Sequence, residues 1–236
     1  VIFYDQAGCG ESTVVVYDDD DITKDYSFLL NVSYYATEEL PAVLHALDIG
    51  KFHLLGHSFG TMLALEYAIY STDASRTNLM SLILASPIPS MQDYNKVQWD
   101  KTYGLMYQMV PPYLLERFRA LIVVGDFDDP EYQRISELCA QRFLLRTAIS
   151  LDCNQATVTG TNMDIYVRMQ GVGEFAEATG TLNTFDVYAN LTDIDTPVLL
   201  LAGEFDVVRP YTLNKMQGML SLSEIAYIER AGHMVM

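Results

Sequence analysis

Residues 52–60 read Phe-His-Leu-Leu-Gly-His-Ser-Phe-Gly and give the clearest indication of the fold. Residues 52–55 are a largely apolar run that predicts a short buried strand, and residues 59–70, rich in Ala, Leu and Met, predict a helix. Between them Gly56, Ser58 and Gly60 match the pattern Gly-x-Ser-x-Gly, in which a strained strand-to-helix turn lifts the serine hydroxyl out of the end of a sheet. The glycines are expected to make this tight turn sterically possible. Ser58 is therefore a candidate nucleophile.

Further strands and a helix are predicted on both sides of this turn. The β-branched and aromatic residues 1–4 predict a buried strand that ends in a glycine-containing loop. Three short apolar runs predict strands at residues 79–85, 198–202 and 225–228, and residues 210–220 predict a helix between the last two. Strand, helix and strand at these spacings favour parallel pairing through crossover helices. The sequence therefore predicts an α/β fold with a mostly parallel sheet and flanking helices.

One more helix is predicted between the strands expected at residues 1–4 and 52–55. The apolar spacing of residues 37–47 fits a helix that tolerates Pro41 only near its first turn, and Gly50 is expected to end it. The four consecutive acids at residues 18–21 are interpreted as a solvated loop.

A long segment interrupts the strand pattern. From residue 88 to residue 186 the sequence consists of polar, aromatic and helix-like stretches with few strand runs. We expect this segment to be an inserted, mostly helical cap subdomain. The predicted organisation is a first part of the core at residues 1–87, the cap at residues 88–186 and a second part of the core at residues 187–236.

Composition excludes several classes of partner. The 236 residues contain 31 Asp plus Glu against 14 Lys plus Arg, which gives a formal charge of −17. Such a chain repels nucleic-acid phosphates and anionic lipid headgroups, so we expect neither nucleic acid nor membrane partners. Cys9, Cys139 and Cys153 contain no C-x-x-C pair and indicate neither a disulfide framework nor a zinc site. The sequence leaves the oligomeric state open and favours the cytoplasm only by default.

Ser58 needs a histidine base, because a serine hydroxyl is a weak nucleophile at neutral pH. Four histidines are present. His45 and His53 fall within a predicted helix and a predicted strand, and His57 adjoins the nucleophile and cannot easily turn back onto it. His233 follows the last predicted strand in a loop and is the expected base.

The carboxylate that orients this base is expected between Ser58 and His233 in the chain, after the penultimate strand. Asp206 fits this position, with Glu204 as the nearest rival. The order Ser58, Asp206, His233 matches that of α/β hydrolases and differs from those of chymotrypsin-like and subtilisin-like proteases.

Several motifs in the same order resemble the proline iminopeptidase family, whose members are serine aminopeptidases with the α/β-hydrolase fold that remove an N-terminal residue, preferentially proline, from peptides. Residues 4–12 resemble the family's Asp-Gln-x-Gly-Cys-Gly-x-Ser segment, and residues 54–68 resemble its serine turn and following helix. Cap motifs are matched at residues 129–132, 169–175, 180–182 and 185–187, and the acid and histidine loops at residues 203–206 and 232–234.

The resemblance implies a mechanism and a set of site residues. Ser58 would attack the scissile carbonyl, His233 would transfer the proton, Asp206 would orient the imidazole, and the Phe59 backbone N–H would donate to the oxyanion. No metal or organic cofactor is implied. Glu174 stands at the cap position whose carboxylate binds the free ammonium group of a peptide or amino-acid amide substrate.

The chain departs from the family pattern in two places. Val207 occupies a position where the family often carries a second amine-binding glutamate, and Glu204 is our candidate for compensating. No His-Gly-Gly-Pro-Gly loop precedes residue 4, and the chain ends three residues after His233, so we expect a fragment truncated at both ends. The second departure would remove one oxyanion donor.

Two other functions stay open. A carboxylesterase or amidase uses the same three residues, and a noncatalytic binding protein keeps the pocket without turnover. Glu174 and the cap favour an amine-bearing substrate, and therefore an aminopeptidase over a carboxylesterase or amidase. The aromatic residues Tyr94, Trp99, Tyr103 and Phe143 are interpreted either as the lining of a pocket for a proline ring or as the core of the cap.

Overall fold

A four-stranded parallel sheet forms the centre of the computed structural model, which describes residues 1–13, 25–71, 78–146 and 151–235. The strands are β1 (Phe52–His57), β2 (Leu79–Ala85), β3 (Val198–Gly203) and β4 (Ser223–Ile228), paired in that order. All three pairings are parallel, and β2 lies beside β3 although the whole helical segment separates them in the chain. The predicted α/β class is confirmed, and each of these strands contains the apolar run that predicted it.

One face of the sheet packs against α3 (Phe59–Tyr70), which begins and ends at the predicted residues. Every residue of α3 from Thr61 to Ile69 is buried, which is typical of a helix enclosed on all sides. Leu82, Leu84 and Leu200 are fully buried in the sheet. Both edge strands have an exposed side, since 45% of the surface of Leu55 in β1 and of Tyr227 in β4 is exposed.

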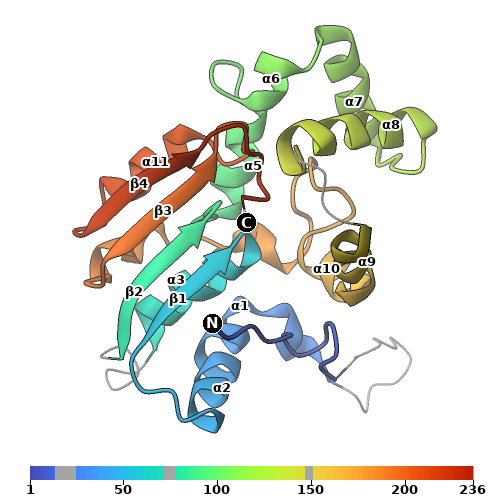
Figure 1. Cartoon of the computed structure of the whole chain (residues 1–236). Helices are drawn as coiled ribbons and strands as arrows, with labels where there is room; N and C mark the ends of the chain where they lie inside the picture. The colour runs from blue at the N-terminus through green and yellow to red at the C-terminus, as the bar shows by residue number, and fades with distance from the viewer. Residues whose placement is uncertain (14–24, 72–77, 147–150, 236) are drawn as a thin grey trace.

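The described residues of the segment between β2 and β3 are mostly helical, as predicted. Its helices are α5 (Met91–Trp99), α6 (Leu105–Met109), α7 (Pro112–Val124), α8 (Pro130–Cys139), η3 (Ala140–Leu144), α9 (Leu151–Gly160), α10 (Met163–Met169), η4 (Thr181–Thr184) and η5 (Tyr188–Asp193). Figure 1 shows α6, α7, α8, α9 and α10 together at one side of the sheet. An antiparallel bridge between Ser90 and Asp186 joins the start of this segment to its end. The division into core and cap subdomains stays a prediction.

The remaining elements surround the sheet. They are η1 (Ser27–Leu30), α1 (Val32–Tyr34), η2 (Tyr35–Glu39), α2 (Leu40–Ala46) and α11 (Pro210–Gln217). The helix predicted at residues 210–220 is α11, which is three residues shorter than expected. Among the described residues, no helix has both the length and the apolar character of a membrane span.

The strand predicted at the N-terminus does not form. Residues 1–4 form no strand, and Val1, Ile2 and Phe3 are exposed. A strand needs a neighbour to accept its backbone hydrogen bonds, and no described strand pairs with these residues. The acidic run at residues 18–21 lies outside the described residues.

The helix predicted at residues 37–47 begins earlier and has an unexpected form. Asn31 caps it by accepting from the Ser33 N–H, so Pro41 lies in its middle rather than in its first turn. Because proline removes a backbone donor, the helix widens into the π-helical turn η2 just before Pro41. The chain then leaves the helix at Asp48, with φ 49°, and not at Gly50 as expected.

Candidate active site

The serine turn has the strained geometry that its sequence predicts. Ser58 lies between β1 and α3 with φ 52° and ψ −118°, a conformation that costs a non-glycine residue about 1–3 kcal/mol. Its backbone N–H donates to the Ala85 carbonyl of β2 at 3.0 Å, which holds the turn against the sheet. A side chain at Gly56 would collide with the Gly60 carbonyl, whereas one at Gly60 would meet open space. Only the first glycine is therefore required by a close approach.

A chain of hydrogen bonds connects Ser58, His233 and Asp206. Nε2 of His233 lies 2.8 Å from Ser58 Oγ, and its Nδ1 lies 2.8 Å from Asp206 Oδ1. Asp206 is fully buried and His233 is 5% exposed. The three residues follow β1, β3 and β4, so they meet at the carboxyl edge of the parallel sheet, where open α/β sheets place their ligands.

Burial alone would disfavour charge on both His233 and Asp206. For Asp206, the attraction of His233 and the hydrogen bonds to the carboxylate outweigh burial, and its pKa falls below the ordinary value. For His233, the Asp206 charge and hydrogen bond likewise outweigh burial, and its pKa rises. The pair therefore favours a proton on the imidazole over a proton on the carboxylate.

Ser86, which the sequence did not single out, and His57 support these three residues. Ser86 is fully buried, with its Oγ 2.6 Å from Asp206 Oδ2 and 2.8 Å from the His233 carbonyl oxygen. The His233 carbonyl also accepts from His57 Nε2 at 2.8 Å, and burial lowers the pKa of His57. Ser86 directly follows β2, so its place at the carboxyl edge of the sheet was the available signal.

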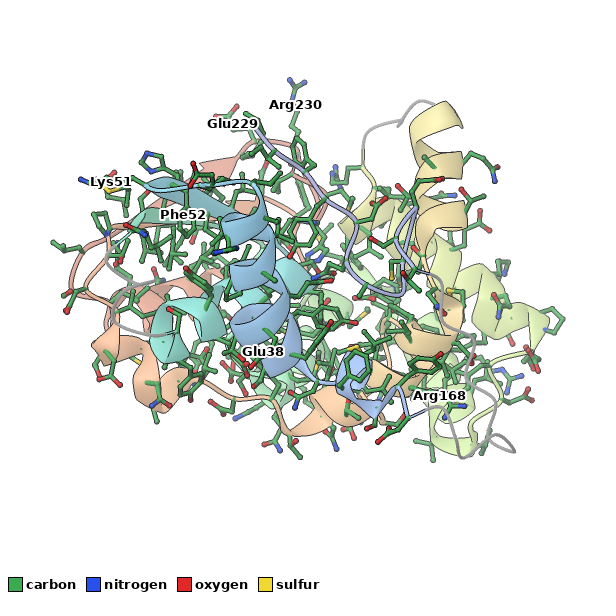
Figure 2. All side chains as sticks on the ribbon, turned by 90° about the horizontal axis from the view of Figure 1, so that it is seen from below. Glu38, Lys51, Phe52, Arg168, Glu229 and Arg230 are labelled. Atoms are coloured by element: carbon green, nitrogen blue, oxygen red, sulfur yellow. The ribbon has the colours of Figure 1, made fainter. Side chains whose placement is uncertain are left out.

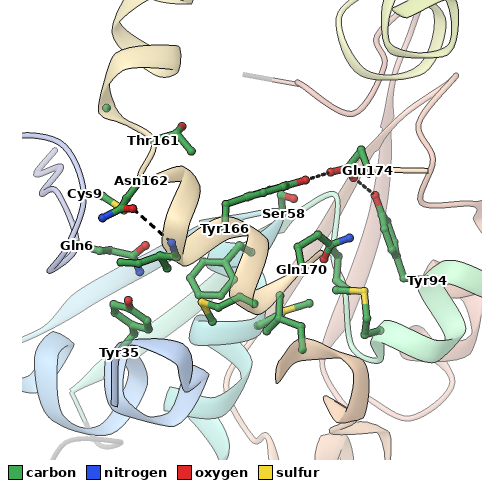
Figure 3. A pocket seen from close by; sticks show the side chains of 18 residues that line it. Gln6, Cys9, Tyr35, Ser58, Tyr94, Thr161, Asn162, Tyr166, Gln170 and Glu174 are labelled. Atoms are coloured by element: carbon green, nitrogen blue, oxygen red, sulfur yellow. Dashed lines mark hydrogen bonds between the residues drawn. The ribbon is translucent and has the colours of Figure 1, made fainter. Parts of the chain in front are cut away.

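Ser58 opens into a cavity of about 340 Å³ that Glu174 also lines (Figure 3). Most of the cavity wall is apolar. Its apolar side chains include Phe59, Met62, Ile88, Met91, Ile165 and Met169. The cavity therefore suits an apolar group placed next to the Ser58 hydroxyl.

Two tyrosine hydroxyls hold the Glu174 carboxylate. Tyr94 donates to Oε1 at 2.7 Å and Tyr166 donates to Oε2 at 2.9 Å, reaching the carboxylate from opposite sides in Figure 3. Burial, and then the Glu174 charge, raise the pKa of both phenols, so both remain donors at neutral pH. The arrangement leaves a fixed carboxylate in a largely apolar cavity beside Ser58.

Other predicted residues lie elsewhere. Glu204 is exposed, and its carboxylate accepts from the Arg230 N–H at 2.9 Å rather than lining the cavity. Val207 is fully buried. Phe59 is the first residue of α3, and N–H groups of a first helical turn have no partner within the helix.

The four aromatic residues divide between the two interpretations. Tyr94 lines the cavity, whereas Trp99, Tyr103 and Phe143 do not. Phe143 is fully buried, and Tyr103 stacks on Tyr211 with ring centroids 5.0 Å apart.

The model of the alpha/beta hydrolase family matches residues 1–236. The chain belongs to this family. This hydrolase is 30% identical to a proline iminopeptidase of Lactobacillus helveticus over 99% of its own length and 74% of that relative. It is 27% identical to a proline iminopeptidase of Chitinophaga pinensis over 85% of its length and 66% of that relative. The crystal structure of a proline iminopeptidase of Mycobacterium smegmatis superposes with a TM-score of 0.81 at 25% identity, covering 97% of this hydrolase and 71% of that chain.

Proposed function

We propose that this hydrolase is a serine aminopeptidase that releases an N-terminal residue, preferentially proline, from peptides. One observation carries the proposal: the Glu174 carboxylate and the Ser58 hydroxyl share a single, mostly apolar cavity. A carboxylate in such a place is costly unless it has a charged partner. The ammonium group of a peptide N-terminus is that partner in our proposal, and the relatives named proline iminopeptidase support it.

In the proposed reaction, Ser58 Oγ attacks the carbonyl carbon of the first residue while His233 Nε2 accepts its proton. The Phe59 N–H donates to the oxyanion that forms, and Asp206 stabilises the imidazolium. His233 then protonates the leaving amine, which frees the shortened peptide and leaves an acyl ester on Ser58. A water molecule, deprotonated by His233, hydrolyses that ester and restores Ser58.

The proposed specificity follows from what surrounds Glu174. Its carboxylate binds the amine of the substrate by a charge-assisted hydrogen bond, and the apolar wall takes the side chain or ring of the first residue. An acetylated amine carries no charge and is expected to be rejected. Glu204 has no part in this proposal, because its carboxylate is exposed and engaged by Arg230.

The test compares a proline naphthylamide, its N-acetylated twin and a short ester, with Ser58→Ala as the inactive control. We expect cleavage of the free-amine substrate and little of the acetylated one. Glu174→Gln should raise KM for the free amine about 10-fold to 150-fold, the equivalent of about 1.5–3 kcal/mol for a hydrogen bond to a charged group. Glu177→Gln removes an exposed carboxylate three residues away and should change KM little. An unchanged KM in Glu174→Gln would overturn the assignment.

A carboxylesterase or amidase is the second candidate, and Val207 favours it. The side chain after Asp206 is apolar and fully buried here, so Glu174 is left without a second carboxylate at that position. Equal rates on the acetylated and free-amine substrates, or cleavage of the ester alone, would support this candidate. A fluorophosphonate that modifies Ser58 would exclude a noncatalytic binding protein.

A further inference from the structure

One short segment outside the sheet contacts the loop that carries His233. The His233 N–H donates to the Phe143 carbonyl at 2.7 Å, and the Met234 N–H donates to the Leu144 carbonyl at 3.0 Å. A side chain at Gly232 would lie 2.6 Å from the Phe143 carbonyl oxygen, so this close approach requires glycine. The backbone of the expected base is therefore attached to the helical segment between β2 and β3.

The end of a helix supplies these acceptors. Phe143 and Leu144 close η3, which continues directly from α8. The last carbonyls of a helix have no partner within it, and here the histidine loop provides the missing N–H groups. The Phe143 side chain is fully buried and fixes η3 in the core.

Arg146, two residues beyond η3, contacts both of the loops that carry Asp206 and His233. Its guanidinium lies 3.7 Å from the ring centroid of Phe205, the neighbour of Asp206. Its Nε donates to the Arg230 carbonyl at 3.2 Å, three residues before His233. The Arg230 side chain points away from the molecule in Figure 2, so only its backbone takes part. One side chain thus bridges the acid loop and the histidine loop.

The same helix also contacts the loop of Glu174. Tyr132 of α8 closely approaches Gly173, and it stacks on Phe118, whose ring lies 6.4 Å from that of Phe175. Gly173 and Phe175 are the two neighbours of Glu174. The segment from α8 to Arg146 therefore contacts the neighbours of Glu174 at one end and the loops of Asp206 and His233 at the other.

We propose that Arg146 is a positioning residue, which keeps Asp206 and His233 aligned on Ser58 by holding Phe205 and the Arg230 carbonyl. This inference rests on the proposed role of these three residues in catalysis. Arg146 itself touches no reacting atom. Loss of its guanidinium should loosen the alignment while leaving the Glu174 cavity unchanged.

The test is Arg146→Ala, with Arg142→Ala as the matched control. Arg142 lies four residues earlier in η3, is also exposed, and its guanidinium donates to the Met109 carbonyl, away from both loops. For Arg146→Ala we expect kcat on the free-amine substrate to fall about 10-fold to 100-fold, the scale of a small misplacement of reacting groups, with KM within about twofold. Modification of Ser58 by the fluorophosphonate should slow in parallel. Arg142→Ala should stay within about twofold of the wild type in both assays.

Two further variants separate positioning from a general loss of stability. Phe205→Leu removes the ring that the guanidinium covers but leaves the hydrogen bond from Arg146 to the Arg230 carbonyl, so the double variant with Arg146→Ala should be little worse than Arg146→Ala alone. Arg146→Lys keeps a cation and a donor and should recover part of kcat. A lower Tm for Arg146→Ala without the change in kcat would overturn the inference and leave a structural role.

Assays of the wild type separate a failure of this inference from a failure of the proposed function. A wild type that the fluorophosphonate does not modify would overturn both. A modified wild type that cleaves esters alone would overturn the aminopeptidase assignment, and the labelling rates would still test Arg146. Equal labelling of the wild type and Arg146→Ala would overturn the positioning role alone.

Discussion

Ser86→Ala tests the electrostatics of the buried site most directly. The hydroxyl lies 2.6 Å from Asp206 Oδ2, and both residues are fully buried. The substitution removes one oxygen and leaves the backbone, whose φ is 54°, in the same region. Asp206 keeps three donors: the Val208 N–H at 2.9 Å and His233 Nδ1 at 2.8 Å on Oδ1, and the more distant Gly203 N–H at 3.5 Å on Oδ2.

The expected loss is that of a hydrogen bond to a charged group. Such a bond contributes about 1.5–3 kcal/mol, so the free energy of unfolding should fall by about 2 kcal/mol near neutral pH. For a chain of this length each kcal/mol corresponds to about 2–4 °C in Tm, which gives a decrease of about 4–8 °C. Because His233 still reaches Asp206, kcat should fall by no more than about tenfold.

The pH dependence of this loss identifies its cause. In the wild type the folded-state pKa of Asp206 lies below its ordinary value, so its contribution to stability is present above the unfolded pKa and disappears as the pH falls through the folded one. Removing the Ser86 donor raises the folded pKa of Asp206. The difference in stability between wild type and variant should therefore be largest near neutral pH and narrow below about pH 4.

Thermal unfolding of the wild type and Ser86→Ala between pH 7 and pH 3 measures this difference. Ser90→Ala is the control, because its buried hydroxyl caps α5 by accepting from the Asp93 N–H and touches no residue of the hydrogen-bonded chain. Its loss should be about 1 kcal/mol at every pH. A similar pH-independent loss for Ser86→Ala would refute the reasoning. It would mean that the Ser86 hydroxyl donates to the His233 carbonyl instead.

Three further predictions concern the cavity of Glu174 and the hydrogen-bonded residues Ser58, His233 and Asp206. Val207→Glu should lower Tm strongly, because the new carboxylate would be buried without a partner at a cost of several kcal/mol, and a folded variant with a lower KM would contradict this. The acid limb of kcat/KM should have its midpoint above 6.5, because His233 must be neutral to act as the base and its pKa is raised, whereas a midpoint below 6.5 would argue against the pair. Tyr166→Phe releases one oxygen of Glu174, so KM for the free amine should rise about fivefold to tenfold with kcat retained; an unchanged KM would count against amine binding by this carboxylate.

Local patterns predicted most of the fold. The predicted bounds of β1 to β4 and of the Ala/Leu-rich helix α3 agree with the structure within two residues. Each of these segments contains its own run of apolar residues, and that run indicates the element. Residues 1–4 have the same composition and failed as a strand, because pairing depends on a neighbour and not on the run itself. Pro41 was misjudged because a π-helical turn accommodates it within the helix.

The candidate site was predictable where chain order carries information. Ser58, Asp206 and His233 each follow a strand, so the parallel topology places them at one edge. Ser86 also follows a strand, and this signal was overlooked. Chain order says nothing about Arg146, whose partners come from far along the sequence. Glu204 shows the converse, because it is near Asp206 in the chain but is held outside the cavity by the Arg230 N–H.

The two tyrosines on Glu174 also affect what binding costs. A carboxylate on a flexible side chain must give up rotamer freedom when it takes a ligand, at about 0.5–1.5 kcal/mol for each immobilised side chain. Tyr94 and Tyr166 have already fixed both oxygens of Glu174 in the empty cavity. Because both phenols are neutral, they restrain the carboxylate without cancelling its charge. An arriving cation therefore meets a preorganised anion, and the ordering that it would otherwise require has been completed by folding.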